Sequence, residues 1–143
     1  IKTMKKIQRK APFELAISCD FNELWRYNIH IISHVLSDNH PVEVLKHDDT
    51  IAEVGAELTS MPNNYSPNRD VVLQTKPADT LITYIYIVPH TLPFTTSIND
   101  APPFELNVEI KHGGREVHMK RYEVNQWSGE NITISCDGGE SAN

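Results

Sequence analysis

The sequence has few of the features on which specialised proteins depend. Two cysteines in 143 residues cannot build a disulfide-rich scaffold, and no apolar run reaches the eighteen residues of a transmembrane segment. Six glycines are present, but no glycine-rich phosphate loop, so the common nucleotide motifs are excluded and no cofactor is expected. Acidic residues outnumber basic ones by 19 to 13, and the net charge of −6 argues against a nucleic-acid partner.

The length and composition are those of a single globular domain. With 39% apolar and 22% charged residues, a chain of 143 residues can bury roughly two thirds of its unfolded surface. We expect a basic flexible arm over residues 1–10, one β-sandwich domain over 11–137 and a frayed tail over 138–143. Lysine and arginine crowd the arm, which is typical of a solvated chain end.

Apolar and polar side chains alternate strictly over residues 104–111, and the same period of two recurs in 13–20 and 131–136. A β-strand with one buried and one exposed face produces this period. We therefore predict an all-β chain with about 7–9 strands. The extended segments are expected near 12–19, 27–36, 42–47, 51–58, 70–75, 81–88, 104–111, 115–126 and 131–136.

Two of these segments depart from simple alternation. Residues 81–88 are apolar or aromatic on both faces, which predicts a central strand covered, at least in part, on both sides. In 115–126 the apolar residues change parity between Met119 and Tyr122, which predicts a β-bulge near residues 120–121. The alternative is a strand whose two ends face different layers.

Turn signals separate the predicted strands. The two glycines within 112–115 favour a tight hairpin, and residues 128–131 fit another. Short hairpins alternate with longer connections such as 89–103, which favours a two-layer antiparallel β-sandwich with Greek-key crossings. The pattern resembles immunoglobulin-like sandwiches in outline, although the Cys–Trp–Cys spacing of a true immunoglobulin domain is absent.

The two cysteines occupy similar positions in similar strands. Cys19 and Cys136 each follow an apolar residue by two positions, so both side chains should face the core. If the first and last strands lie together, a disulfide can close a loop of more than a hundred residues. The alternative is two buried free thiols that act as small apolar groups.

The histidines raise the question of a metal site. In an extended strand His30 and His34 share a face but lie about 13 Å apart, too far to bind one ion. We therefore assign no metal ligands and no catalytic residues. A metal-dependent enzyme or metal-binding protein remains an alternative, with ligands from His30, His34, His40 and His47 together with Asp48 and Asp49.

Aromatic residues near predicted loops are the best binding candidates. Exposed rings at the end of a sandwich can stack on a sugar or anchor a peptide. Tyr65 lies in a proline- and asparagine-rich segment, Phe94 follows two prolines, and Trp25 and Trp127 flank predicted strands. We take these four residues as candidate ligand-binding or partner-binding side chains, with packing in the core as the alternative for each.

These features favour a non-catalytic β-sandwich module that binds a partner protein or a glycan. The partner would contact loop 60–69, loop 89–103 or an exposed strand edge. The module is expected to be part of a larger surface, secreted or secretion-apparatus protein, and an extracellular or periplasmic location is favoured over the cytoplasm. A third hypothesis is a structural subunit that forms homo-oligomers through a sheet edge.

Overall fold

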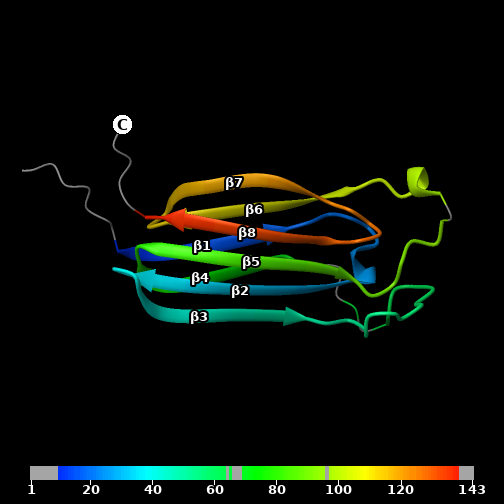
Figure 1. Ribbon diagram of the computed structural model, residues 1–143, viewed down its shortest axis with the longest axis horizontal. Helices are drawn as coiled ribbons and strands as arrows, with labels where there is room; N and C mark the ends of the chain where they lie inside the picture. Colours follow the sequence, from blue (N-terminus) through cyan, green and yellow to red (C-terminus); the bar gives the residue numbers. More distant parts are fainter. Residues whose placement is uncertain (1–9, 64, 66–68, 96, 139–143) are drawn as a thin grey trace, which may run out of the picture.

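The computed structural model describes residues 10–63, 65, 69–95 and 97–138, and these form a β-sandwich with short 3-10 turns (Figure 1). The predicted arm and tail lie almost entirely outside the described residues. The elements are β1 (Ala11–Ser18), η1 (Leu24–Arg26), β2 (Tyr27–Ser37), β3 (His40–Asp49), β4 (Val71–Ala78), β5 (Thr80–Pro89), η2 (Ile98–Asp100), β6 (Phe104–His112), β7 (Arg115–Val124) and β8 (Glu130–Asp137).

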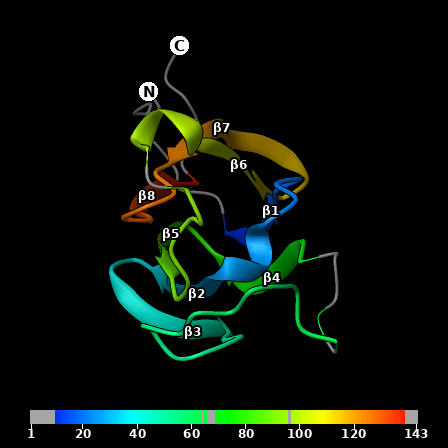
Figure 2. The ribbon, with the colours of Figure 1, turned by 90° about the vertical axis from the view of Figure 1, so that its right-hand side faces the viewer.

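The eight strands form two four-stranded antiparallel sheets, which confirms the predicted two-layer sandwich. One sheet has the order β4-β1-β6-β7 and the other the order β3-β2-β5-β8, and Figure 2 shows them packed face to face. Alternate residues of both sheets point into one core, as the period of two requires. Fully buried members of this core include Phe13, Leu15, Ile31, Ile85, Leu106 and Ile110.

Most connections cross from one sheet to the other. In the described chain only β2–β3 and β6–β7 are hairpins within a sheet, and the other five connections change sheets. The first two strands therefore lie in different sheets, whereas those of an immunoglobulin constant domain lie side by side. The likeness to immunoglobulin domains is limited to the two-layer architecture.

Tight turns occur where the sequence supplies residues that tolerate positive φ. Gly113 and Gly114 have φ values of 59° and 83° and join β6 to β7, which confirms the predicted hairpin. Asp38 and Asn39, with φ values of 52° and 64°, make the equivalent turn between β2 and β3. Both residue types are among the few non-glycine residues that adopt this conformation readily.

The predicted bulge exists, but it lies earlier in β7. Ile110 pairs with His118 whereas Lys111 pairs with Glu116, so the extra residue is Val117 rather than one near positions 120–121. After this bulge the even-numbered residues face the core. Tyr122 consequently packs against the core, and Met119 points to solvent.

Two sequence-based predictions about local structure are wrong. Residues 51–58 form a loop rather than a strand, with a turn in which Ala56 N donates to Glu53 O at 3.0 Å and Gly55 has a φ of 96°. The turn over 125–129 is tight, but it carries the chain between sheets and is not a sheet hairpin. In both places the local pattern carried no information on strand partners.

β5 is a central strand, as predicted, because it pairs with both β2 and β8. Its inward residues are buried, and its outward residues are half-buried. The described residues contain no helix long and apolar enough to cross a membrane.

Candidate binding site

Four connections meet at one end of the sandwich, which we call the loop end. They are the described parts of 19–26, 50–70, 90–103 and 125–129, and Figure 1 shows them opposite the two hairpins. The strand directions require this arrangement, since β1, β3, β5 and β7 finish at this end. Loops that a rigid sandwich gathers at one end are common binding surfaces.

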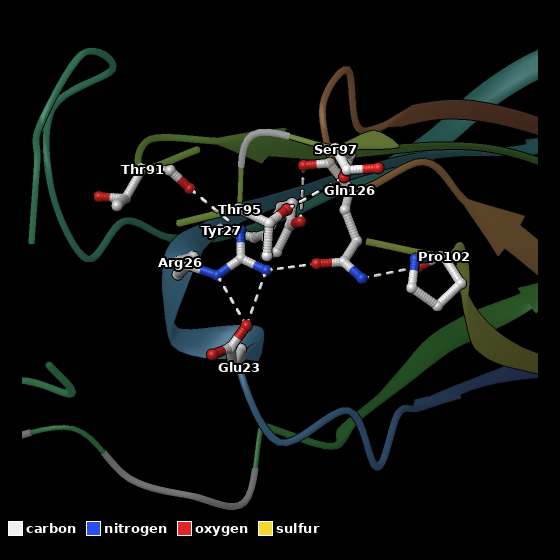
Figure 3. Close-up of polar contacts among 8 residues, drawn as sticks. All are labelled: Glu23, Arg26, Tyr27, Thr91, Thr95, Ser97, Pro102 and Gln126. Carbon is white, nitrogen blue, oxygen red and sulfur yellow. Dashed lines mark hydrogen bonds and ion pairs between the residues drawn. The ribbon is translucent and has the colours of Figure 1, made fainter. Parts of the chain in front are cut away.

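A fully buried arginine holds three of these loops together (Figure 3). The Arg26 guanidinium contacts Glu23 Oε1 through Nε at 3.2 Å and Nη2 at 3.0 Å. Its Nη1 donates to Thr91 O at 3.2 Å, and its Nη2 also donates to Gln126 Oε1 at 2.5 Å. A buried charge is tolerated only when it is paired and hydrogen-bonded in this way.

Gln126 joins the network to the far end of connection 90–103. Its Nε2 donates to Pro102 O at 2.6 Å, and its own carbonyl accepts a 2.8 Å hydrogen bond from the Tyr27 hydroxyl. Burial raises the pKa of Tyr27 to about 12, so this hydroxyl keeps its proton under ordinary conditions. The network therefore fixes the loop backbones through hydrogen bonds alone.

His90 connects the same region to loop 50–63. His90 Nε2 lies 2.7 Å from Trp25 O and must donate to it, so Nδ1 is left to accept from the Thr91 hydroxyl at 2.8 Å. The Thr91 oxygen in turn accepts from Leu58 N at 3.3 Å. Burial lowers the pKa of His90, which agrees with the neutral ring that this chain of hydrogen bonds requires.

An apolar groove of about 410 Å³ lies between the two segments that these contacts hold. Residues 54–57 form one wall and residues 89–94 the other. Val54, Leu92 and Phe94 are 71%, 54% and 56% exposed, so three large apolar side chains meet solvent in one place. Apolar side chains gathered around a concavity are typical of a ligand or partner site.

The charge at the loop end is strongly one-sided. The four connecting segments contain no lysine and two arginines, Arg26 and Arg69, and both arginines are buried. Each is paired with a carboxylate, of Glu23 and Asp49 respectively. The remaining charges in these segments are acidic and comprise Asp20, Glu53, Glu57, Asp70 and Asp100. The loop end as a whole therefore carries an excess of negative charge.

Arg69 anchors the second half of loop 50–70. Its Nη1 donates to Leu24 O and Tyr27 O, each at 2.8 Å, and its Nε donates to Asp49 at 2.8 Å. The guanidinium also lies 5.7 Å from the centre of the Tyr65 ring. Tyr65 is half-buried by this packing, and desolvation raises its pKa. A cation–π contact of this kind gives the ring a structural role.

The predicted aromatic residues all lie at the loop end, but in different surroundings. Phe94 lines the groove, and the buried Trp25 ring lies behind it at a centroid distance of 6.4 Å. Among the described residues no ring contact joins Tyr65 or Trp127 to this pair. Trp127 is half-buried, and its Nε1 has no hydrogen-bond partner in the described chain.

The residues of the metal hypothesis do not converge. His30 pairs with Asp48 across β2 and β3 at 2.9 Å, whereas His40 lies at the far hairpin and hydrogen-bonds to Asp38 O. His47 lies opposite Ile31 and so faces away from His30. No group of three metal-ligating side chains occurs within the described ranges. The candidate ligands His34 and Asp49 contact Tyr84 and Arg69 instead.

The disulfide between Cys19 and Cys136 is not formed, and both thiols are free. Cys19 follows β1 at the loop end, where its thiol donates to Glu105 O at 3.3 Å. Cys136 pairs with Leu81 at the opposite end of the sandwich. The prediction placed the two residues together because it overlooked that β1 and β8 run in opposite directions. Burial raises the pKa of Cys136 to about 11, which makes it an unreactive thiol.

Sequence reasoning missed the polar residues that shape the site. Arg26 stands between Trp25 and Tyr27, and a cation flanked by large aromatic residues was the available signal of burial. Gln126 and His90 carried no such signal. The exposed Val54 was missed because its segment was assigned to a strand.

Comparisons with known proteins leave the family undefined. No family model matches the chain, and no curated protein matches it. Among solved structures, the crystal structure of a DUF4425 family protein from Bacteroides ovatus matches with a TM-score of 0.44 and 9% sequence identity. The match covers 91% of this chain and 95% of that chain.

Proposed function

We propose that this protein is a non-catalytic binding module that holds a basic polypeptide segment at its loop end, with one apolar side chain of the partner in the groove. The observation that carries this proposal is the exposed apolar cluster of Val54, Leu92 and Phe94 inside a negatively charged surface. An apolar side chain gains by leaving water there, and neighbouring lysines or arginines gain from the carboxylates.

A polypeptide fits this groove better than a glycan does. A sugar needs many hydrogen-bonding side chains around it, and the polar atoms of His90 and Thr91 already bond to one another and to the backbone. Glu57 is the one carboxylate on the groove wall. What the groove offers is mainly apolar surface, which suits a leucine, methionine or aromatic side chain.

The buried polar network supports tight positioning of the groove walls. Both His90 N and Thr91 N donate to Arg26 O, at 2.9 and 3.3 Å, and Thr91 O accepts from the guanidinium. The wall 89–94 is thereby fixed before a partner arrives. Preorganisation of this kind reduces the entropy that binding must overcome.

A model peptide tests the proposal. The blocked peptide Lys-Lys-Leu-Lys-Lys is titrated into the 15N-labelled protein, alongside Glu-Glu-Leu-Glu-Glu and Lys-Lys-Gly-Lys-Lys. We expect shifts in residues 54–57 and 89–94 with the first peptide, a Kd on the order of 1 mM, and clear weakening at high salt. Phe94→Ala and Glu57→Gln should each weaken binding by about threefold or more.

The matched control is Met119→Ala, because Met119 is 64% exposed on β7, outside the groove. It should leave the titration unchanged. Equal binding of the acidic peptide, or binding that ignores Phe94→Ala, would contradict the proposal. Shifts in the groove with a neutral oligosaccharide such as maltoheptaose, and none with the basic peptide, would assign the site to a glycan instead.

A further inference from the structure

The outer face of the β3-β2-β5-β8 sheet is apolar at its centre. Its central side chains are all half-buried, and they are Ile32 from β2 and Ile82, Tyr84, Tyr86 and Val88 from β5. Figure 2 shows this sheet with its outer face turned away from the other sheet, and no other strand or helix of the described chain lies over it. A contiguous apolar centre on an otherwise uncovered sheet face often marks an interaction surface.

The cross-strand register places polar residues around this centre. Ile32 lies beside Tyr84, and this pair is flanked by Lys46 on β3 and Thr133 on β8. The next row places Tyr86 between His30 and Asn131. An apolar centre enriched in tyrosine and surrounded by a polar rim has the anatomy of a protein interface.

The two tyrosines point to the same conclusion. No hydrogen bond joins the hydroxyl of Tyr84 or Tyr86 to another described residue, although the Tyr84 ring meets His34 edge-on at 5.9 Å. A half-buried tyrosine normally directs its hydroxyl to water or to a partner. These hydroxyls are free to do so at the surface.

Three of the four sheet edges are much less suited to association. Pro41 lies in the edge strand β3 and Pro77 in the edge strand β4, and β7 combines a bulge with Lys120, whose ammonium lies over the Tyr122 ring. Proline, bulges and charged residues at edges are devices that prevent strand addition. They disfavour strand addition at β3, β4 and β7. The fourth edge strand, β8, has no such device, but the sheet face beside it offers more apolar surface than one strand edge does.

The charge of this face selects the partner. The protein carries a net charge of −6, so two copies can meet only where their surfaces are close to neutral. On the outer face Lys46 offsets Asp48, whose carboxylate lies 2.9 Å from His30, and the exposed Asp137 lies on the same face at the end of β8. The face therefore carries little net charge, so a strongly charged partner gains little there and a second copy meets little repulsion.

We propose that the outer face of the β3-β2-β5-β8 sheet is a homodimer surface, on which a second copy packs face to face about a two-fold axis. Four strands spaced about 4.8 Å apart, over about eight residues each, offer about 500 Å² per copy. The total of about 1,000 Å² lies at the lower limit of specific interfaces, so the dimer should be weak, with a Kd on the order of 100 µM.

Sedimentation equilibrium of the full chain, at protein concentrations from about 10 µM to about 1 mM, tests this proposal. We expect the average mass to rise toward that of a dimer, with little dependence on salt because the face is near neutral. Tyr84→Lys places like charges opposite one another and should weaken the dimer by at least about tenfold. Met119→Lys adds the same charge to the outer face of the other sheet and should leave the mass curve unchanged.

A second measurement does not depend on any variant folding. In a dilution series of 15N spectra, concentration-dependent shifts should concentrate on β2 and β5 residues of the outer face. A mass that stays monomeric to about 1 mM, or shifts confined to the groove or to the other sheet, would overturn the proposal. Shifts on this face with lipid bicelles or cellohexaose, in a monomeric protein, would assign the face to that ligand.

Discussion

The Nη2 atom of Arg26 lies 2.5 Å from the Oε1 atom of Gln126, a residue one hundred positions later in the chain. This contact joins η1, directly before β2, to the turn between β7 and β8. Each of these two connections carries the chain from one sheet to the other. Because the two cysteines are free and lie far apart, the loop end depends on such buried polar contacts for its shape.

Replacement of Arg26 by methionine should destabilise the protein by about 3 kcal/mol, because the carbonyl of Thr91 and the amide of Gln126 lose a buried charged donor. Guanidinium chloride unfolding measures the loss. The control is Arg121→Met, since Arg121 and Glu105 form an exposed pair at 4.0 Å that should contribute less than about 1 kcal/mol. Equal effects of the two variants would show that the buried network has no special role.

Gly129→Ala should be far more damaging than Gly114→Ala. Both glycines have positive φ, 74° and 83°, so both substitutions carry a backbone cost of about 1 kcal/mol. A Cβ at Gly129 would also overlap the carbonyl oxygen of Ile87 and lie 2.9 Å from Pro89 Cδ, whereas a Cβ at Gly114 meets nothing within 4 Å. The two melting temperatures, measured under identical conditions, should differ by several degrees. Similar melting temperatures would mean that the backbone of the turn at Gly129 shifts at little cost to accommodate the added Cβ.

The alternation in residues 104–111 was sufficient to predict β6. Successive side chains of a strand point to opposite faces, so a strand with one buried face shows this period in its own sequence. The same alternation failed in 51–58 because a strand also needs a hydrogen-bonded neighbour, and no pattern within one segment shows whether a neighbour exists. The parity change in β7 likewise revealed a bulge but could not place it at Val117.

The candidate site could be predicted only in part, for a related reason. Phe94 was identified because it lies in the predicted loop 89–103, which is local information. The network of Arg26 and Gln126 depends on a contact between residues far apart in sequence, which no local pattern encodes. The direction of each strand, which separates Cys19 from Cys136, is also a property of the whole topology.

Acidification should destabilise the protein through His90. Burial lowers the pKa of His90 below its ordinary value of 6.5, so between the two values the unfolded chain binds more protons than the folded protein does. The unfolding free energy must therefore fall as the pH drops below 6.5 toward the pKa of the folded state. Protonation of Nδ1 also removes the acceptor that Thr91 uses, which loosens the contact between Thr91 and Leu58.

Urea unfolding at about pH 7 and about pH 5 measures this loss. We expect the difference between the two pH values to be smaller in His90→Gln than in the unchanged protein. Burial lowers the pKa of His118 as well, so His118→Gln should remove a separate part of the slope. The two residues belong to different parts of the sandwich, and the double variant should show the sum of both effects. If the unfolding free energy of His90→Gln depended on pH as strongly as that of the unchanged protein, protonation of His90 would not be the cause of the acid destabilisation.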